Sequence, residues 1–130
     1  MTVLERAVQV ASGARKNSWS PYSKFAVGAA LKVRGHDALV PGCNVENASF
    51  GGTICAERSA VVAAISQHGK VEFDFLVVVT DTDPPAMPCA FCRGVLSEFC
   101  GPELVIHLAN PDGIKKSVTL GELLPYPFKL

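Results

Sequence analysis

Hydrophobic positions along the chain recur first at a helical spacing and then at a strand spacing. Between residues 2 and 16 the apolar side chains repeat every three or four positions, and Thr2 with Glu5 forms a pattern typical of a capping box. The segment 25–33 has the composition of a strand, and residues 38–43 are expected to pair with it across a short polar turn. The first third of the chain is therefore predicted to be a helix followed by a hairpin.

The rest of the chain continues to alternate between these two spacings. Residues 60–65 are apolar on every side of a helix, so this helix should be largely buried. The apolar run at 75–79 is typical of a strand covered on both faces. The elements expected here are a helix over 55–67 with Gly69 as its C-terminal stop, a strand over 75–79, a helix over 89–99, strands over 104–108 and 115–120, and a short helix over 121–124. This order predicts an α/β fold with helices on both faces of a mixed sheet.

Size and charge narrow the classes of function. The chain has 130 residues, which fits a single domain over 1–130. Its formal net charge is zero and its lysines and arginines are scattered, which argues against a nucleic-acid partner. No stretch has the length and apolarity of a membrane span, and the first residues do not resemble an export signal. The five cysteines therefore favour metal binding or catalysis over disulfides, and a cytoplasmic location is predicted.

Three of the cysteines are spaced as metal ligands. Cys55 stands where one helix is expected to begin, and Cys89 and Cys92 lie three residues apart at the start of the next. Residues three apart share a helix face, and a helix N-terminus favours the thiolate form that binds zinc. Glu57 lies two residues after the first thiol and can stand beside the metal without ligating it. Zinc with a nearby glutamate is typical of the hydrolytic deamination of a nucleobase.

Other interpretations of these residues are a structural zinc site or buried, inert thiols. A structural site needs a fourth protein ligand, and the remaining candidates have no ligand spacing to the three cysteines: Cys43, Cys100, His36, His68 and His107. This favours an open, catalytic site. Glu57 is also explained by the preference for acidic residues in a first helical turn, but its position beside the open site predicts proton transfer.

Two arginines follow the predicted ligands closely. Arg58 comes three residues after Cys55, and Arg93 comes directly after Cys92. Three thiolates on a divalent ion leave a net negative charge, which hydrogen bonds from either guanidinium to the sulfurs would reduce. The alternative interpretation is that both arginines form ion pairs on the surface.

With these motifs in place, the chain resembles the small cytidine deaminases that use three cysteine ligands and form homotetramers. The similarity rests on motifs that occur in order over nearly the whole length, at residues 20–31, 42–49, 55–58, 88–93 and 122–125. It implies a three-layer α/β/α fold with a five-stranded sheet, and one zinc ion per subunit. It also implies the deamination of cytidine and 2′-deoxycytidine for pyrimidine salvage, with active sites completed across contacts in a homotetramer.

The resemblance also implies substrate contacts. Asn44 and Glu46 would bind the sugar hydroxyls, and Phe128 would stack on the base in a neighbouring subunit. The complete set of implied contacts is Phe25, Asn44, Glu46, Ala48, Phe50, Ala56 and Phe128. Taken alone, the residues allow other interpretations: a turn for Asn44 and Glu46, core packing for Phe25, and a frayed tail for Phe128.

The chain departs from the family pattern beside the metal ligands and in the sugar-binding segment. Ala90 and Gly94 stand where glycine and glutamine are usual, Phe91 is larger than the usual residue, and Phe50 replaces a frequent tyrosine. A blasticidin S deaminase has the same metal motif, but the segment 44–50 matches the nucleoside enzymes instead. A non-catalytic zinc-binding homologue is a further alternative, against which the intact Glu57 argues.

Overall fold

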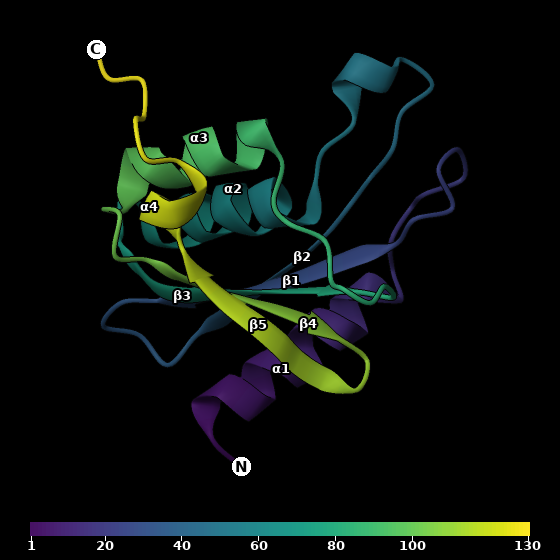
Figure 1. Cartoon of the computed structure of the whole chain (residues 1–130), viewed down its shortest axis with the longest axis horizontal. Helices are drawn as coiled ribbons and strands as arrows, with labels where there is room; N and C mark the ends of the chain where they lie inside the picture. Colours follow the sequence, from purple (N-terminus) through teal and green to yellow (C-terminus); the bar gives the residue numbers. More distant parts are fainter.

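The computed structural model describes residues 1–130, and Figure 1 shows helices on both sides of a central sheet. None of the helices is long and apolar enough to cross a bilayer. The elements are α1 (Val3–Arg15), β1 (Val27–Val33), β2 (Leu39–Cys43), the 3₁₀ helix η1 (Phe50–Gly52), α2 (Ala56–His68), β3 (Phe73–Thr80), α3 (Ala90–Phe99), β4 (Val105–Asn110), β5 (Gly113–Thr119) and α4 (Leu120–Leu123).

The five strands form one mixed sheet in the order β2-β1-β3-β4-β5. β3 and β4 run parallel, with α3 in the connection between them, and the other neighbouring pairs are antiparallel. The expected α/β class with a mixed five-stranded sheet is therefore confirmed. Each predicted helix and strand is present, and the ends differ from the expected ones by two residues at most.

Each face of the sheet has its own apolar layer. α1 covers one face, where Ala7 and Ala11 pack against residues of β1 and β3. α2 and α3 lie on the opposite face, as Figure 1 shows, over the larger cluster that contains Leu31, Leu76 and Leu96. The ends of α2 and α3 that carry the predicted ligands are therefore held on the same side of the sheet.

The prediction that α2 is buried along residues 60–65 is wrong at Val62, whose side chain is 59% exposed. α2 contacts the sheet with the side where Ala60, Val61 and Ala64 are buried, and Val62 lies outside that contact. The predicted C-terminal stop is confirmed. Gly69 follows the helix with a φ of 74°, a left-handed backbone conformation that glycine adopts without steric cost.

Two glycines let the helices approach the sheet closely. A Cβ atom at Gly42, in β2, would lie 2.6 Å from the backbone nitrogen of Ala60 and closer still to the carbonyl oxygen of Ala56. At Gly28, in β1, an added Cβ would lie 2.7 Å from the backbone nitrogen of Arg15 in α1. The first turn of α2 therefore sits directly on β2, which fixes the height of Cys55 above the sheet.

Candidate metal and substrate site

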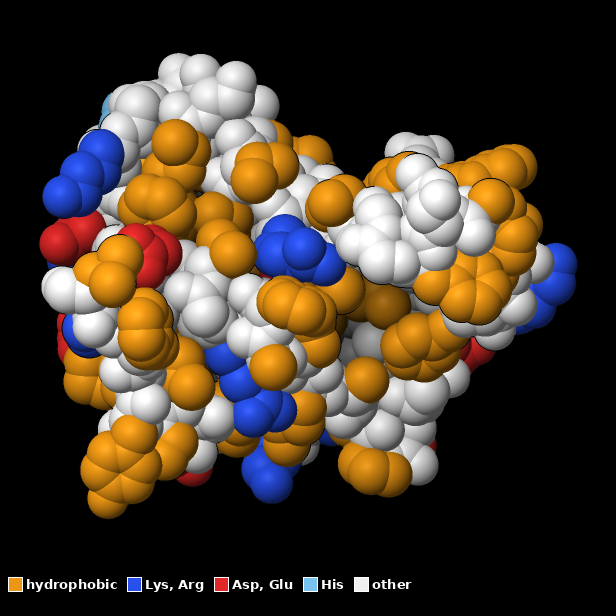
Figure 2. Space-filling view, turned by 90° about the horizontal axis from the view of Figure 1, so that it is seen from above, with side chains coloured by type: hydrophobic (Ala, Val, Ile, Leu, Met, Phe, Trp, Pro, Cys, Tyr) orange, Lys and Arg blue, Asp and Glu red, His pale blue; other side chains and the backbone are white.

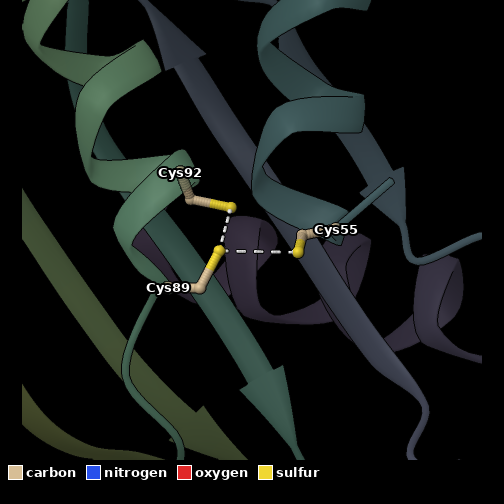
Figure 3. A group of neighbouring side chains, drawn as sticks. All are labelled: Cys55, Cys89 and Cys92. Atoms are coloured by element: carbon tan, nitrogen blue, oxygen red, sulfur yellow. Dashed lines mark hydrogen bonds between the residues drawn. The ribbon is translucent and has the colours of Figure 1, made fainter. Parts of the chain in front are cut away.

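Three sulfur atoms converge where α2 and α3 begin, as Figure 3 shows. Cys55 is the N-cap of α2, Cys89 is the N-cap of α3, and Cys92 is one turn further along α3. The sulfur of Cys89 lies 3.7 Å from that of Cys55 and 3.5 Å from that of Cys92. The two helix N-termini thus bring together thiols that are 34 residues apart in sequence.

This geometry fits a zinc ion. Zinc–sulfur bonds of 2.3 Å in a tetrahedron place two sulfurs about 3.8 Å apart, close to the separations observed. All three sulfurs lie within 4.8 Å of one another, and no other cysteine, histidine, aspartate or glutamate joins the cluster. The protein therefore offers three ligands rather than four, which is the pattern of a catalytic zinc site.

The thiols share their protons unequally. The hydrogen bond with Cys92 lowers the pKa of Cys55 to about 5, and hydrogen bonds from Arg58 and Cys89 act in the same direction. The same bond, together with burial, raises the pKa of Cys92. The cluster thus holds a thiolate at Cys55 near neutral pH, which is the form that zinc requires.

The structure gives the two arginines different partners. Arg58 donates from Nη2 to the sulfur of Cys55 at 3.5 Å and to the carbonyl oxygen of Thr53 at 3.2 Å. Arg93 instead donates to the carbonyl oxygens of Pro88 at 2.8 Å and Leu123 at 2.9 Å. The expected contact with a sulfur is thus present for Arg58, whereas Arg93 ties the loop before α3 to α4.

Glu57 lies in the first turn of α2, directly after the ligand region, and is only 5% exposed. Burial raises the pKa of its carboxyl to about 7, and the nearby charge of Cys55 adds to this rise while Arg58 opposes it. A carboxyl with a pKa near neutral pH can both accept and return a proton, which suits a general acid–base catalyst.

A cavity of about 310 Å³ opens beside the sulfurs. Figure 2 shows the surface hollowed next to the projecting segment that carries η1. Of the predicted residues, those that line this cavity are Phe25, Asn44, Glu46, Cys55, Ala56, Glu57 and Cys89. Phe50 lines a neighbouring hollow that shares Ser23, Glu46 and Thr53 with the cavity.

Two predicted substrate contacts lie away from the cavity in this chain. Ala48 is not among the lining residues of either hollow. Phe128, in the C-terminal tail, is 80% exposed and belongs to no apolar cluster. Its ring is therefore free to contact something other than its own subunit.

Asn44 is a buried polar residue whose amide is mostly occupied. Its Oδ1 accepts hydrogen bonds from the N–H of Val27 at 2.9 Å and from the hydroxyl of Ser18, and its Nδ2 donates to the carbonyl of Phe25 at 2.8 Å. The side chain thereby fixes the entry into β1. One Nδ2 proton is left for a further acceptor.

Glu46 is likewise engaged with its own chain. Its Oε1 accepts from the N–H groups of Tyr22 at 2.9 Å and Ser23 at 3.1 Å, and its Oε2 accepts from the hydroxyl of Ser23. The hydrogen bond from Ser23 is the main reason that the pKa of Glu46 is lowered. These bonds hold a turn in which Lys24 has a φ of 60°, an uncommon value for a residue with a side chain.

Several cavity residues were not predicted from the sequence. Thr80 is fully buried at the end of β3, and its hydroxyl accepts from the N–H of Ala86 at 3.2 Å, which anchors the loop that leads to Cys89. The signal for it was present, since Thr80 is the first polar residue after the apolar strand, at a strand end where α/β folds place ligands. The others are Ser23, Val27, Thr53, Val78, Ala86 and Met87.

Comparison with known proteins gives one family. The cytidine and deoxycytidylate deaminase zinc-binding region matches residues 1–108 of the chain. The chain is similar to a cytidine deaminase of Sporosarcina psychrophila, with 40% identity over 125 residues that cover 96% of this chain and 90% of the relative. A cytidine deaminase of Mycobacterium tuberculosis is 45% identical over 125 residues, with 95% and 85% covered.

Solved structures agree with the sequence relatives. The crystal structure of a cytidine deaminase from Burkholderia pseudomallei superposes with a TM-score of 0.90 at 38% identity, covering 98% of this chain and all of that one. The crystal structure of the cytidine deaminase from Mycobacterium tuberculosis gives a TM-score of 0.82 at 40% identity, with 97% of each chain covered. The fold is thus similar to that of known cytidine deaminases.

Proposed function

The chain belongs to the cytidine and deoxycytidylate deaminase family and catalyses the zinc-dependent deamination of cytidine; we propose that Glu57 is its catalytic residue and 2′-deoxycytidine a second substrate. The observation that carries the proposal is the buried Glu57 carboxyl in a cavity shared with two of the three cysteine ligands. We also propose that residues 1–130 form one domain, because both apolar layers belong to the same sheet.

The cysteines Cys55, Cys89 and Cys92 would hold the zinc ion, one per subunit. Zinc, when bound there, lowers the pKa of a coordinated water and so supplies a nucleophile near neutral pH. Glu57 takes a proton from the attacking water and delivers it to the ring nitrogen beside the carbon that bears the amine. Glu57 then takes the second proton from the hydroxyl group added to the ring carbon and passes it to the departing amine, so that the C–N bond breaks, ammonia leaves and a carbonyl remains on the ring.

The side chains of Asn44 and Glu46 support a substrate with a sugar. After their bonds within the protein, Asn44 retains one N–H donor and Glu46 retains lone pairs on Oε2. One donor and one acceptor suffice for a single hydroxyl group, which both accepts and donates. We propose that this hydroxyl is the 3′-OH. Cytidine and 2′-deoxycytidine both carry it, so the pair accepts either sugar.

Exposed apolar side chains support a homotetramer. Val62 on α2 and Phe91 on α3 are 59% and 74% exposed, and Phe128 is 80% exposed on a short tail. Figure 2 shows that such side chains gather on the face that α2, α3 and the tail form. Burial of this surface between subunits would bring the ring of Phe128 to a neighbouring cavity, where it can stack on the base.

A cytoplasmic location is proposed from the chemistry of the cysteines. All five are free thiols in the structure, and the site depends on three of them staying reduced. The reducing conditions of the cytoplasm maintain free thiols, whereas an oxidising compartment promotes disulfides.

The substrate proposal is tested with four compounds. The zinc-loaded protein is incubated with cytidine, 2′-deoxycytidine, 2′,3′-dideoxycytidine and blasticidin S, and ammonia release is followed. We expect turnover of the first two with similar KM values. The KM of the dideoxy compound should be about tenfold or more higher, because the missing 3′-hydroxyl leaves the side chains of Asn44 and Glu46 without a partner. Similar KM values for all three nucleosides would contradict the hydroxyl assignment. Turnover of blasticidin S alone would contradict the nucleoside assignment.

A further inference from the structure

Phe91 occupies the spacer between two of the metal ligands and points into contact with the other helix. It stands in the first turn of α3, between Cys89 and Cys92, and its side chain is 74% exposed. The guanidinium carbon of Arg58, in the first turn of α2, lies 5.6 Å from the centre of the Phe91 ring. This distance is within the range of a cation–π interaction.

Arg58 has few other partners for a charged side chain next to the metal site. Only its Nη2 donates hydrogen bonds, to the carbonyl of Thr53 and to the sulfur of Cys55. Its Nε is buried without a hydrogen-bond partner. Besides these acceptors and the charge of Cys92, the face of the Phe91 ring is the aromatic group that contacts the cation.

The strength of the contact between Arg58 and the sulfur of Cys55 depends on the fraction of time that the guanidinium spends in this one conformation. A free arginine side chain loses considerable rotamer entropy when it is held in one conformation, and a sulfur at 3.5 Å is a weak acceptor. A ring that covers one side of the guanidinium reduces the number of alternative conformations. It also excludes water from the charge, which strengthens the attraction to the thiolates.

We propose that Phe91 is a positioning residue for the metal centre, which holds the Arg58 guanidinium against the thiolate of Cys55 and thereby strengthens zinc binding. The inference rests on the assignment of the three cysteines as zinc ligands, and it gives the large residue in the spacer a role. Phe91 is neither one of the three cysteine ligands nor a residue that lines the cavity. Its effect passes through Arg58.

The test is a double-mutant cycle on zinc affinity. Phe91→Leu keeps an apolar side chain of similar size and removes the aromatic ring, and Arg58→Ala removes the cation. Zinc affinity is measured by competition with a chromogenic chelator for the wild type, the two single variants and the double variant. We expect Phe91→Leu to weaken zinc binding about two- to fivefold in the wild-type background, which corresponds to an exposed cation–π contact. In the Arg58→Ala background the same change should have no effect.

Equal losses in the two backgrounds would overturn the proposal, and so would no loss in either. Phe91→Trp should retain or increase the affinity, because tryptophan is the strongest partner for a cation. Tyr126→Leu is the matched control, since it removes an aromatic ring that is 93% exposed and makes no contact with another ring or with a cation. Zinc affinity is read without substrate, so this result is independent of whether the nucleosides are turned over.

Discussion

The two sides of the cavity are constructed by different means. On the cysteine side, Cys55 and Cys89 are placed by the packing of two helix N-termini on the sheet, and their side chains bind each other and Arg58. On the sugar side, Asn44 and Glu46 are placed by hydrogen bonds between their own side chains and neighbouring backbone groups, most of which the backbone donates. On the first side the functional groups contact one another and are not needed to hold the backbone, whereas on the second side most of them hold it.

On the cysteine side, the groups that carry the chemistry are therefore different from those that hold the fold. On the sugar side, the same groups do both. A substitution at a thiol or at Glu57 removes chemistry from an otherwise complete scaffold. A substitution at Asn44 or Glu46 removes a proposed substrate contact and at the same time releases a segment of the backbone. The first three predictions below test this contrast, the fourth concerns a residue outside the cavity, and they are given in order of decreasing effect.

Replacement of Glu57 by glutamine should have the largest effect. The amide has nearly the same shape but cannot carry the proton, so kcat should fall by a factor of about 10² to 10⁴ while the zinc content and the free energy of unfolding stay close to wild type. Steady-state kinetics, metal analysis and urea denaturation provide the three measurements. A variant with retained turnover would remove Glu57 from its proposed role.

Replacement of Gly42 by alanine should show that packing places the cysteine side. The added Cβ clashes with the backbone of α2, so the first turn of the helix must move, at a cost of about 1–3 kcal/mol in the free energy of unfolding. Gly28→Ala is the matched control, because its clash is with α1 on the other face. We expect both variants to lose stability and Gly42→Ala alone to lose zinc affinity. Equal zinc affinity in the two variants would contradict the claim that the packing of α2 on β2 places the cysteine ligands.

Replacement of Asn44 by alanine should show that structure and binding are joined on the sugar side. The change leaves the N–H of Val27 and the carbonyl of Phe25 without a partner, which should lower the free energy of unfolding by about 1–3 kcal/mol and raise KM. Zinc affinity should not change. The measurements are urea denaturation, substrate kinetics and chelator competition. A raised KM without any loss of stability would show that other contacts hold the backbone of Phe25 and Val27 in place.

His107 provides the smallest effect and lies outside both sides of the cavity. Burial in β4 lowers its pKa below 6.5, so the folded protein binds a proton there less readily than the unfolded chain. Its contribution to stability is complete above pH 6.5 and is lost as the pH falls through the pKa of the folded state. Urea denaturation between pH 5 and 7.5 should show a shallower pH dependence for His107→Gln than for the wild type. An identical pH dependence in the two proteins would contradict a lowered pKa of His107 in the folded state.

Local patterns predicted the elements and the metal ligands, because helix periodicity, strand composition and ligand spacing are properties of short segments. Thr80 and Ser23 were not predicted, since only the order of the strands and the bonds of Glu46 bring them to the cavity. The exposed Val62 was missed for a related reason: an apolar helix does not reveal which of its sides faces its own sheet. The exposed Phe128 side chain agrees with the frayed tail that the residues alone favoured, whereas its contact with a neighbouring subunit was implied by resemblance and stays a prediction.

The two hydrogen bonds of Arg93 have a consequence for the C-terminal tail. By binding the carbonyl of Leu123, Arg93 fastens the start of the tail to the helix that carries two of the zinc ligands. Phe128 is five residues further on, and a fully extended chain of that length spans about 18 Å at most. In the proposed homotetramer, Leu123 would therefore lie within that distance, plus the length of one phenylalanine side chain, of the neighbouring cavity that the ring of Phe128 enters. Such a short connection would give the ring a high effective concentration at that cavity.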